Sequence, residues 1–109
     1  MPEQILQINF KLNMSRAEYD QLAVHAAEPI AATPGLVWKV WLMNEAGKEA
    51  GGIYLFVDEA SLQAFLNSPI VADIGSHPML TDLSVKRFGV MADVTMVTRG
   101  PIGERVLER

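Results

Sequence analysis

The sequence predicts an α+β fold in which helices cover one face of a four-stranded antiparallel sheet, the ferredoxin-like or split βαβ arrangement. Two observations predict it. Four segments have the alternation or the composition of β-strands, and helical patterns separate them in the order β-α-β-β-α-(α)-β. The two middle strands are joined only by a short turn, as the split βαβ unit requires. With 109 residues, half of them hydrophobic, we expect a single domain over residues 1–109.

The first predicted strand covers residues 4–12 and leads into a helix. Its alternate residues are apolar, which places one side in the core: Leu6, Ile8, Phe10 and Leu12. Ser15 and Glu18 then have the spacing of a capping box, which predicts that a helix begins there. Apolar residues recur at four-residue spacing along this helix, at Leu22, Ala26 and Ile30. Pro34-Gly35 ends the segment.

Residues 36–43 and 49–57 are predicted to form a β-hairpin, because the first is rich in β-branched and aromatic types and Gly47 lies between them. A two-residue turn at Ala46-Gly47 sets Lys39 opposite Tyr54 and Trp41 opposite Gly52. We expect Gly52 to leave room for the Trp41 indole. One set of side chains is expected to share the face that the helices leave open, and a second subunit to cover it: Lys39, Trp41, Tyr54 and Phe56.

The second half of the chain is predicted from its helix caps. Asp58 starts a helix that ends near residue 67. Ser68-Pro69 starts a short helix that ends near Gly75 and is closed by His77-Pro78. The fourth strand is predicted at residues 83–91. The tail from Asp93 stays open, because residues 94–98 have β-propensity and Gly100-Pro101 follows at once.

Composition excludes several classes of site. The net charge of −4 argues against a nucleic-acid partner. The absence of cysteine excludes disulfides and thiolate chemistry, and two histidines 52 positions apart argue against a metal centre. No apolar run approaches the roughly 20 residues that span a bilayer. The N-terminal residues lack the pattern of a signal peptide, so we expect a cytoplasmic protein without membrane contact.

Trp38, Lys39, Trp41 and Tyr54 form the most unusual constellation in the sequence. They predict a pocket with aromatic walls and a cation, in which Lys39 stabilises a phenolate or enolate and either an indole N–H or the Tyr54 hydroxyl orients a substrate oxygen. On a strand, Trp38 and Trp41 point to opposite faces. The alternative is that both tryptophans fill the core or an interface and that Lys39 pairs with a carboxylate such as Glu49.

Two further polar residues have alternative interpretations. Asn9 is either a hydrogen-bonding group at the mouth of the sheet or a solvated side chain beside Gln7 and Lys11. His77 is either a ligand contact with acid–base capacity or a histidine on the surface of a loop. We assign no function to His25, which lies near the apolar stripe of the first helix but not on it.

Two long segments carry a resemblance to a known family. Residues 34–41 (PGLVWKVW) and 49–59 (EAGGIYLFVDE) resemble the signature of the YdhR family of monooxygenases, and residues 6–10 and 86–88 also fit its pattern. The resemblance implies a ferredoxin-like subunit of a dimeric α+β barrel. It also implies kinship with cofactor-independent monooxygenases that oxidise polycyclic phenols in antibiotic biosynthesis. In those enzymes the deprotonated substrate itself reduces dioxygen, so neither flavin nor metal is needed.

The resulting hypothesis is a homodimeric, cofactor-free monooxygenase that uses dioxygen to oxidise a small aromatic or phenolic compound. Its expected catalytic residues are Lys39, Asn9 and Tyr54, and its expected substrate contacts are Trp38, Trp41, Phe56 and His77. One alternative is a non-catalytic protein that binds a small hydrophobic ligand. Another is a haem-degrading relative in which Asn9 and His77 act on haem, although Phe65 stands where those relatives have a tryptophan. Asn9 also stands where relatives in the YdhR family carry histidine.

Overall fold

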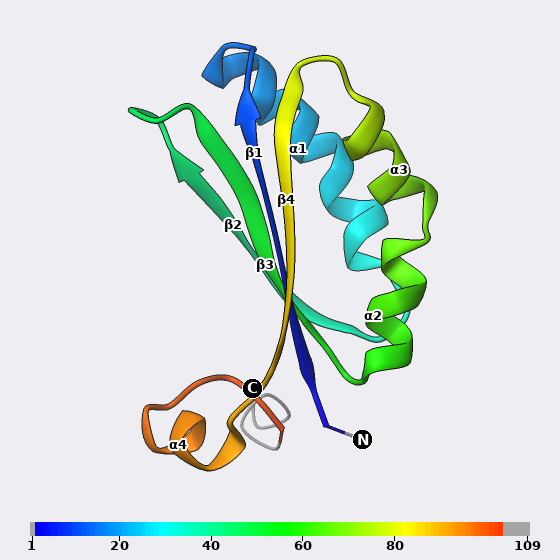
Figure 1. Cartoon of the computed structure of the whole chain (residues 1–109), viewed down its shortest axis with the longest axis vertical. Helices are drawn as coiled ribbons and strands as arrows, with labels where there is room; N and C mark the ends of the chain where they lie inside the picture. The colour runs from blue at the N-terminus through cyan, green and yellow to red at the C-terminus, as the bar shows by residue number, and fades with distance from the viewer. Residues whose placement is uncertain (1, 104–109) are drawn as a thin grey trace.

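The computed structural model describes residues 2–103, which form one antiparallel sheet with helices packed against it (Figure 1). In chain order the elements are β1 (Gln4–Leu12), α1 (Arg16–Ala31), β2 (Leu36–Asn44), β3 (Glu49–Phe56), α2 (Glu59–Leu66), α3 (Pro69–Ser76), β4 (Leu80–Gly89) and α4 (Ala92–Val97). The strand order is β2-β3-β1-β4, with every neighbouring pair antiparallel. The predicted ferredoxin-like α+β fold is confirmed.

The core lies on one face of the sheet, where the alternating residues of β1 are buried. Leu6, Ile8, Phe10 and Leu12 are all at most 6% exposed. The helices contribute the opposite layer of this core: Tyr19 and Ile30 from α1, and Leu62 and Phe65 from α2. Burial of these apolar side chains is what holds helices and sheet together.

Side-chain caps begin the helices where the sequence predicts them. Ser15 Oγ accepts a hydrogen bond from the Glu18 N–H at 3.1 Å, and Glu18 Oε1 accepts one from the Ser15 N–H at 2.9 Å, so the capping box is confirmed. The side chains of Asp58 and Ser68 cap α2 and α3 by accepting hydrogen bonds from the N–H groups of Ser61 and Val71. Within residues 2–103, no helix has the length and apolar character needed to cross a bilayer.

The register of the β2–β3 hairpin is the predicted one. Lys39 opposes Tyr54, and Trp41 opposes Gly52. A hydrogen bond from the Lys48 N–H to the Glu45 carbonyl closes the turn at 3.2 Å, with Ala46-Gly47 at its centre. The local turn therefore set which residues of the two strands face each other.

The boundaries of β4 and the conformation of the tail differ from the prediction. β4 begins at Leu80 rather than at residue 83, because Leu80 pairs with Leu12 of β1 and is buried beside it. The tail does not extend the sheet: α4 occupies the segment with β-propensity. Because the sheet offers this segment no partner strand, local helical hydrogen bonds satisfy its backbone, such as the one from the Thr95 N–H to the Met91 carbonyl.

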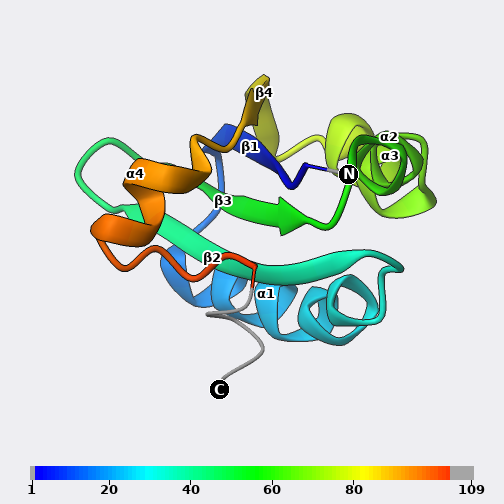
Figure 2. The same cartoon turned by 90° about the horizontal axis from the view of Figure 1, so that it is seen from below.

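The two faces of the sheet have different cover. The helices α1, α2 and α3 pack on the covered face, while α4 lies on the other side of the sheet (Figure 2). Lys39, Trp41, Tyr54 and Phe56 do share a face, but the expectation that it is the open one is wrong. Tyr54 pairs with Leu6 of β1 and therefore points with Leu6 toward the helices. The other side, which we call the open face, carries Asn9, Trp38 and Val40.

Candidate functional site

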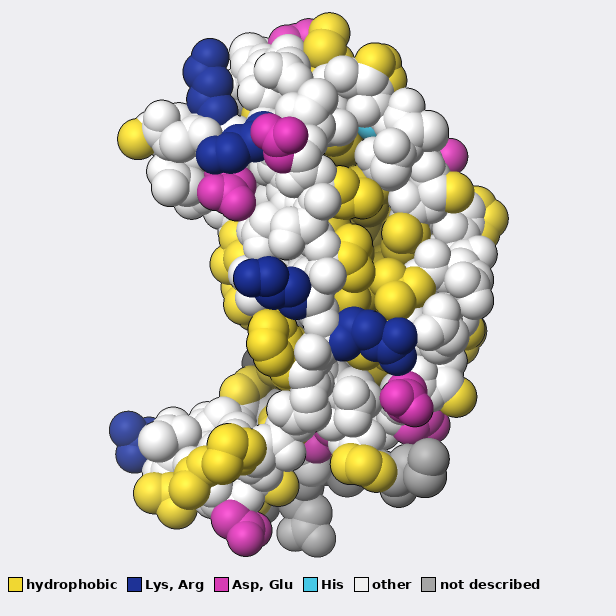
Figure 3. Space-filling view, in the orientation of Figure 1, with side chains coloured by type: hydrophobic (Ala, Val, Ile, Leu, Met, Phe, Trp, Pro, Cys, Tyr) yellow, Lys and Arg dark blue, Asp and Glu magenta, His cyan; other side chains and the backbone are white. Residues whose placement is uncertain are grey.

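A cavity of about 480 Å³ lies between the covered face of the sheet and the helices α1 and α3. Apolar side chains line a hollow between β4 and these helices (Figure 3). The sheet contributes Phe10, Lys39, Trp41, Gly51 and Tyr54 to the cavity wall. The helices contribute mainly aliphatic groups, among them Leu22, Ala26, Ile30, Ile70 and Ile74. This size and lining suit a small, mostly apolar ligand.

Lys39 reaches the cavity from the edge strand β2. Its Nζ lies 3.3 Å from the centre of the Trp41 ring and 4.6 Å from the centre of the Tyr54 ring. A Cβ atom at Gly52 would lie 2.4 Å from Lys39 Cε. Gly52 therefore makes room for the Lys39 stem, and the expectation that it makes room for the Trp41 indole is wrong. The long aliphatic stem lies across Gly52, which brings its amine to the neighbouring ring.

The surroundings of the Lys39 amine are aromatic and apolar. Burial lowers the pKa of Lys39 to about 7 from an ordinary value of 10.5. The alternative that Lys39 pairs with Glu49 is wrong, because Glu49 lies 3.8 Å from Lys11 Nζ on the opposite face. Among the described residues, no carboxylate lies within 4.0 Å of the Lys39 amine. Two aromatic rings take the place of a counter-ion, so the amine is available to a ligand.

Tyr54 supplies a second polar group to the same cavity. Its side chain is 1% exposed, and its ring is packed against Phe56 and Phe65, with centroid distances of 6.3 and 5.1 Å. No group within residues 2–103 makes a hydrogen bond to its hydroxyl. Burial, together with the nearby Tyr19 hydroxyl, raises the pKa of Tyr54 above its ordinary value. The hydroxyl therefore stays protonated and can donate to a ligand oxygen.

The structure brings together four of the seven residues singled out in the sequence. Lys39, Trp41, Tyr54 and His77 all line the cavity. Their elements are far apart in sequence: the first three come from the β2–β3 hairpin, whereas His77 follows α3. The hairpin register and the position of α3 over the sheet therefore assemble the site.

The other three residues lie outside the cavity wall. Asn9 is on the open face, where its Oδ1 accepts from Gln7 Nε2 at 2.8 Å. Trp38 is also on that face, and its indole N–H donates to the Pro101 carbonyl at 2.9 Å. Phe56 is fully buried in the core, where it packs against Tyr54. Asn9 and His77, the pair named for haem chemistry, thus lie on opposite sides of the sheet.

Several cavity residues were not singled out from the sequence. They are polar side chains of α1 and α3: Tyr19, Gln21, His25 and Asp73. The spacing of His25 carried a usable signal, because it lies three residues after Leu22 and four before Pro29, which also line the cavity. Within residues 2–103, no three His, Asp or Glu side chains converge to hold a metal ion.

Comparison with known proteins agrees with this fold. Residues 5–101 match the protein family described as "Putative mono-oxygenase ydhR". The chain belongs to that family. No curated protein sequence matches it.

Several solved structures share the fold of this YdhR-family chain. SnoaB, a cofactor-independent oxygenase from Streptomyces nogalater, superposes with a TM-score of 0.69 at 17% identity, over 86% of this chain and 98% of SnoaB. NE2512 from Nitrosomonas europaea, a protein of unknown function, gives a TM-score of 0.63 at 23% identity, over 84% and 92% of the two chains. The haem-degrader MhuD from Mycobacterium tuberculosis gives 0.62 at 21% identity, over 82% and 97%. At these identities the likeness shows a shared fold.

Proposed function

We propose that this chain is a cofactor-independent monooxygenase that oxidises a small phenolic or otherwise acidic aromatic compound with dioxygen. One observation carries the proposal. The Lys39 amine lies on the rings of Trp41 and Tyr54 in an apolar cavity, without a carboxylate partner among the described residues. Such a group binds a flat anion, because the rings offer stacking surface and the ammonium offers the opposite charge. The family match to monooxygenases supports the same reading.

In the proposed reaction, the neutral Lys39 amine accepts the proton of a phenol. With a pKa of about 7, much of the amine is neutral near neutral pH. The resulting ammonium stays beside the phenolate and stabilises it, while the Tyr54 hydroxyl donates to a substrate oxygen and orients it. Trp41 provides the stacking wall. Asn9, Trp38 and Phe56 have no part in this chemistry, since they lie outside the cavity.

The oxidation itself balances without a redox cofactor. The phenolate gives one electron to dioxygen, and the two radicals combine at the ring carbon para to the oxygen to form a hydroperoxide. Loss of water from this hydroperoxide leaves a quinone carbonyl. One oxygen atom of dioxygen enters the product and the other becomes water. The substrate loses four electrons and dioxygen gains four, so the proposed reaction needs no flavin or metal. We therefore propose that the purified protein is colourless.

Oxygen uptake tests the proposal. Metal-free protein is incubated with a panel of phenols and anthrones, and dioxygen consumption and quinone formation are followed together. We expect turnover with at least one of these compounds, at equal amounts of dioxygen consumed and quinone formed. Tight binding without oxygen uptake would instead support the alternative of a non-catalytic binding protein.

We also propose that the working unit is a homodimer formed through the open face. An apolar band crosses that face and includes Val40 and Phe88, which are 51% and 48% exposed. On α4, Met91, Val94 and Val97 are 74%, 56% and 77% exposed. α4 and the hairpin bound a concave surface (Figure 3). A second copy of the chain that fills this concavity would bury the apolar side chains of the open face and those of α4.

The cytoplasmic location stays a prediction.

A further inference from the structure

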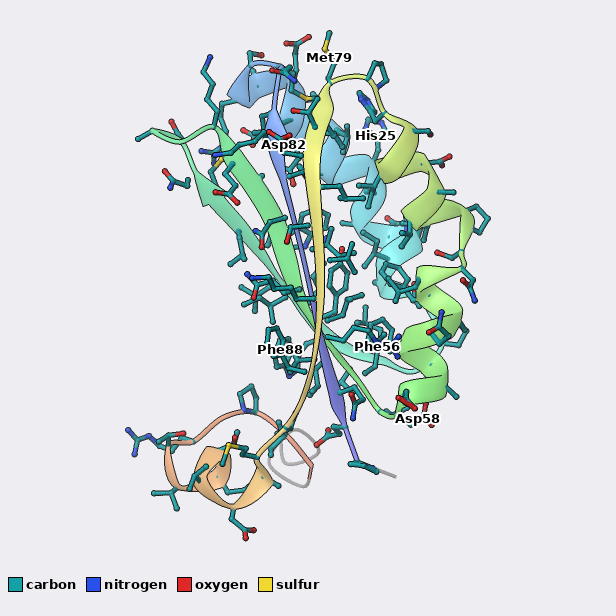
Figure 4. All side chains as sticks on the ribbon, in the orientation of Figure 1. His25, Phe56, Asp58, Met79, Asp82 and Phe88 are labelled. Atoms are coloured by element: carbon teal, nitrogen blue, oxygen red, sulfur yellow. The ribbon has the colours of Figure 1, made fainter. Side chains whose placement is uncertain are left out.

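The two histidines of the chain meet the same cavity from different elements. His25 lies on α1 and His77 follows α3, and both line the cavity that holds Lys39. His25 lies beside the connection between α3 and β4, at the same end as Met79 (Figure 4). The sequence separates the two histidines by 52 positions, and they reach one cavity because both α1 and the end of α3 border it.

Each imidazole has one nitrogen engaged by its own backbone segment, and these contacts set opposite tautomers. His25 Nδ1 lies 2.8 Å from the Gln21 carbonyl oxygen, which can only accept, so Nδ1 carries the proton. His77 Nδ1 lies 3.1 Å from the Met79 backbone nitrogen, which donates, so Nδ1 accepts. In the neutral rings, His25 Nε2 is therefore an acceptor and His77 Nε2–H is a donor.

This histidine pair and Lys39 occupy different ends of the cavity. The amine of Lys39 lies over Trp41, which pairs through Gly52 with Ile8 of β1. His77 stands just before β4, whose first residue pairs with Leu12, four residues further along β1. Because four strand residues span roughly 13 Å, Ile8 and Leu12, the β1 residues at the two ends, are separated by about that distance along the strand. Three strand spacings, roughly 14 Å, also separate β2 from β4. Between the two ends the wall is mainly aliphatic and aromatic.

We infer that the cavity recognises an elongated aromatic ligand with polar groups at both ends. The acidic oxygen binds at Lys39, and a distal hydroxyl donates to His25 Nε2 while it accepts from His77 Nε2–H. A hydroxyl group is matched to this pair because it offers one donor and acceptor lone pairs on one atom. The inference rests on the proposed function, because it assigns the substrate class of the same site. Gln21, Asp73 and Tyr19 are the other polar side chains of the wall.

A matched pair of ligands tests the inference. The compounds are 4-phenylphenol and 4,4′-biphenol, which share a two-ring body and differ only in the distal hydroxyl. Binding is measured without dioxygen by quenching of Trp41 fluorescence in a Trp38→Phe background, so that catalysis does not intervene. We expect 4,4′-biphenol to bind about 10-fold tighter, beyond the statistical advantage of its two equivalent ends.

Asparagine and glutamine variants separate the two nitrogens of each ring. His25→Asn keeps a donor for the Gln21 carbonyl and His77→Asn keeps an acceptor for the Met79 N–H, but both lose the group at Nε2. We expect both to lose the preference for 4,4′-biphenol and to bind 4-phenylphenol as the parent does. His25→Gln restores a polar group near the Nε2 position and should recover much of the preference. Thermal melting of each variant checks that it is folded.

The outcomes distinguish this inference from the proposed function. If the parent binds both ligands equally well, or if both asparagine variants keep the preference, the distal histidine site is overturned while the phenol site stands. If His25→Gln behaves as His25→Asn does, the assignment of His25 is overturned. If neither ligand binds at millimolar concentration, both the inference and the proposed phenol site are overturned.

Discussion

The two faces of one sheet use the same residue types for different purposes. Trp41 and Trp38 lie three residues apart on β2. Trp41 lines the cavity, where the Lys39 amine lies over its ring. Trp38 points to the open face, and its indole N–H donates to the Pro101 carbonyl. The lysines differ in the same way: Lys39 lies among aromatic rings, while Lys11 lies near the Glu49 carboxylate in solvent. Residue type alone does not identify which member of either pair lines the cavity, because the face that a residue occupies decides its environment.

Exchanging the cavity lysine gives the largest expected effect. Lys39→Met removes the amine that we propose accepts the proton and stabilises the anion, while much of the stem volume remains. We expect turnover to fall on the order of 100-fold, with the fold and the oligomeric state retained. Oxygen uptake, thermal melting and light scattering on one sample measure this.

Lys11→Met is the matched control for that experiment. Its ion pair with Glu49 is exposed and contributes little to stability, so activity should stay near the parent value. A folded Lys39→Met protein with full turnover would remove Lys39 from the mechanism, and an equal loss in both variants would point to a general effect of charge.

A charge on the open face tests the role in dimer assembly that we propose for it. Phe88→Glu introduces a carboxylate into the apolar band, and two-fold symmetry brings a second copy of that carboxylate to the same interface. We expect the dimer to weaken by about 2 kcal/mol, or roughly 30-fold in its dissociation constant. Light scattering over a dilution series measures the shift. A parent protein that is already a 12.0 kDa monomer at micromolar concentration would refute the dimer.

Gly52→Ala displaces the Lys39 stem without removing the amine. The new Cβ would lie 2.4 Å from Lys39 Cε and 3.2 Å from the Val40 carbonyl oxygen, so the stem must move. We expect turnover to fall on the order of 10-fold, because the amine leaves its position over Trp41. Gly89→Ala is the control, since its Cβ would meet nothing closer than 3.9 Å. Equal activity in the two variants would show that the position of the amine does not matter.

The pH dependence of stability gives the smallest expected effect. Burial lowers the pKa of Lys39 from 10.5 to about 7, so between these two pH values the unfolded chain binds more protons at this residue than the folded protein does. The free energy of unfolding should therefore rise with pH in this window. We expect the difference in Tm between the parent and Lys39→Met to shift by a few degrees in favour of the parent from pH 7 to 9. If the Tm values of the two proteins changed with pH by the same amount, that result would contradict the lowered pKa of Lys39.

Local patterns in the sequence predicted most of the fold. The alternation in β1, the capping box at Ser15 and the turn at Ala46-Gly47 each depend on residues within a few positions, and the structure confirms all three. The Lys39–Tyr54 pair follows from the same turn. The start of β4 could not be read in this way, because it depends on pairing with Leu12, far away in sequence.

By itself, the sequence determined which side chains share a face of the hairpin, since strand alternation and a short turn are local. Only the tertiary structure decided that this face lies under the helices, because that depends on the pairing of Leu6 with Tyr54 across 48 positions of chain. The same packing excluded Asn9 from the cavity and brought His25 to it. The sequence shows which side chains are capable of chemistry. Their convergence on one cavity depends on the positions of helices and strands, which only long-range contacts decide.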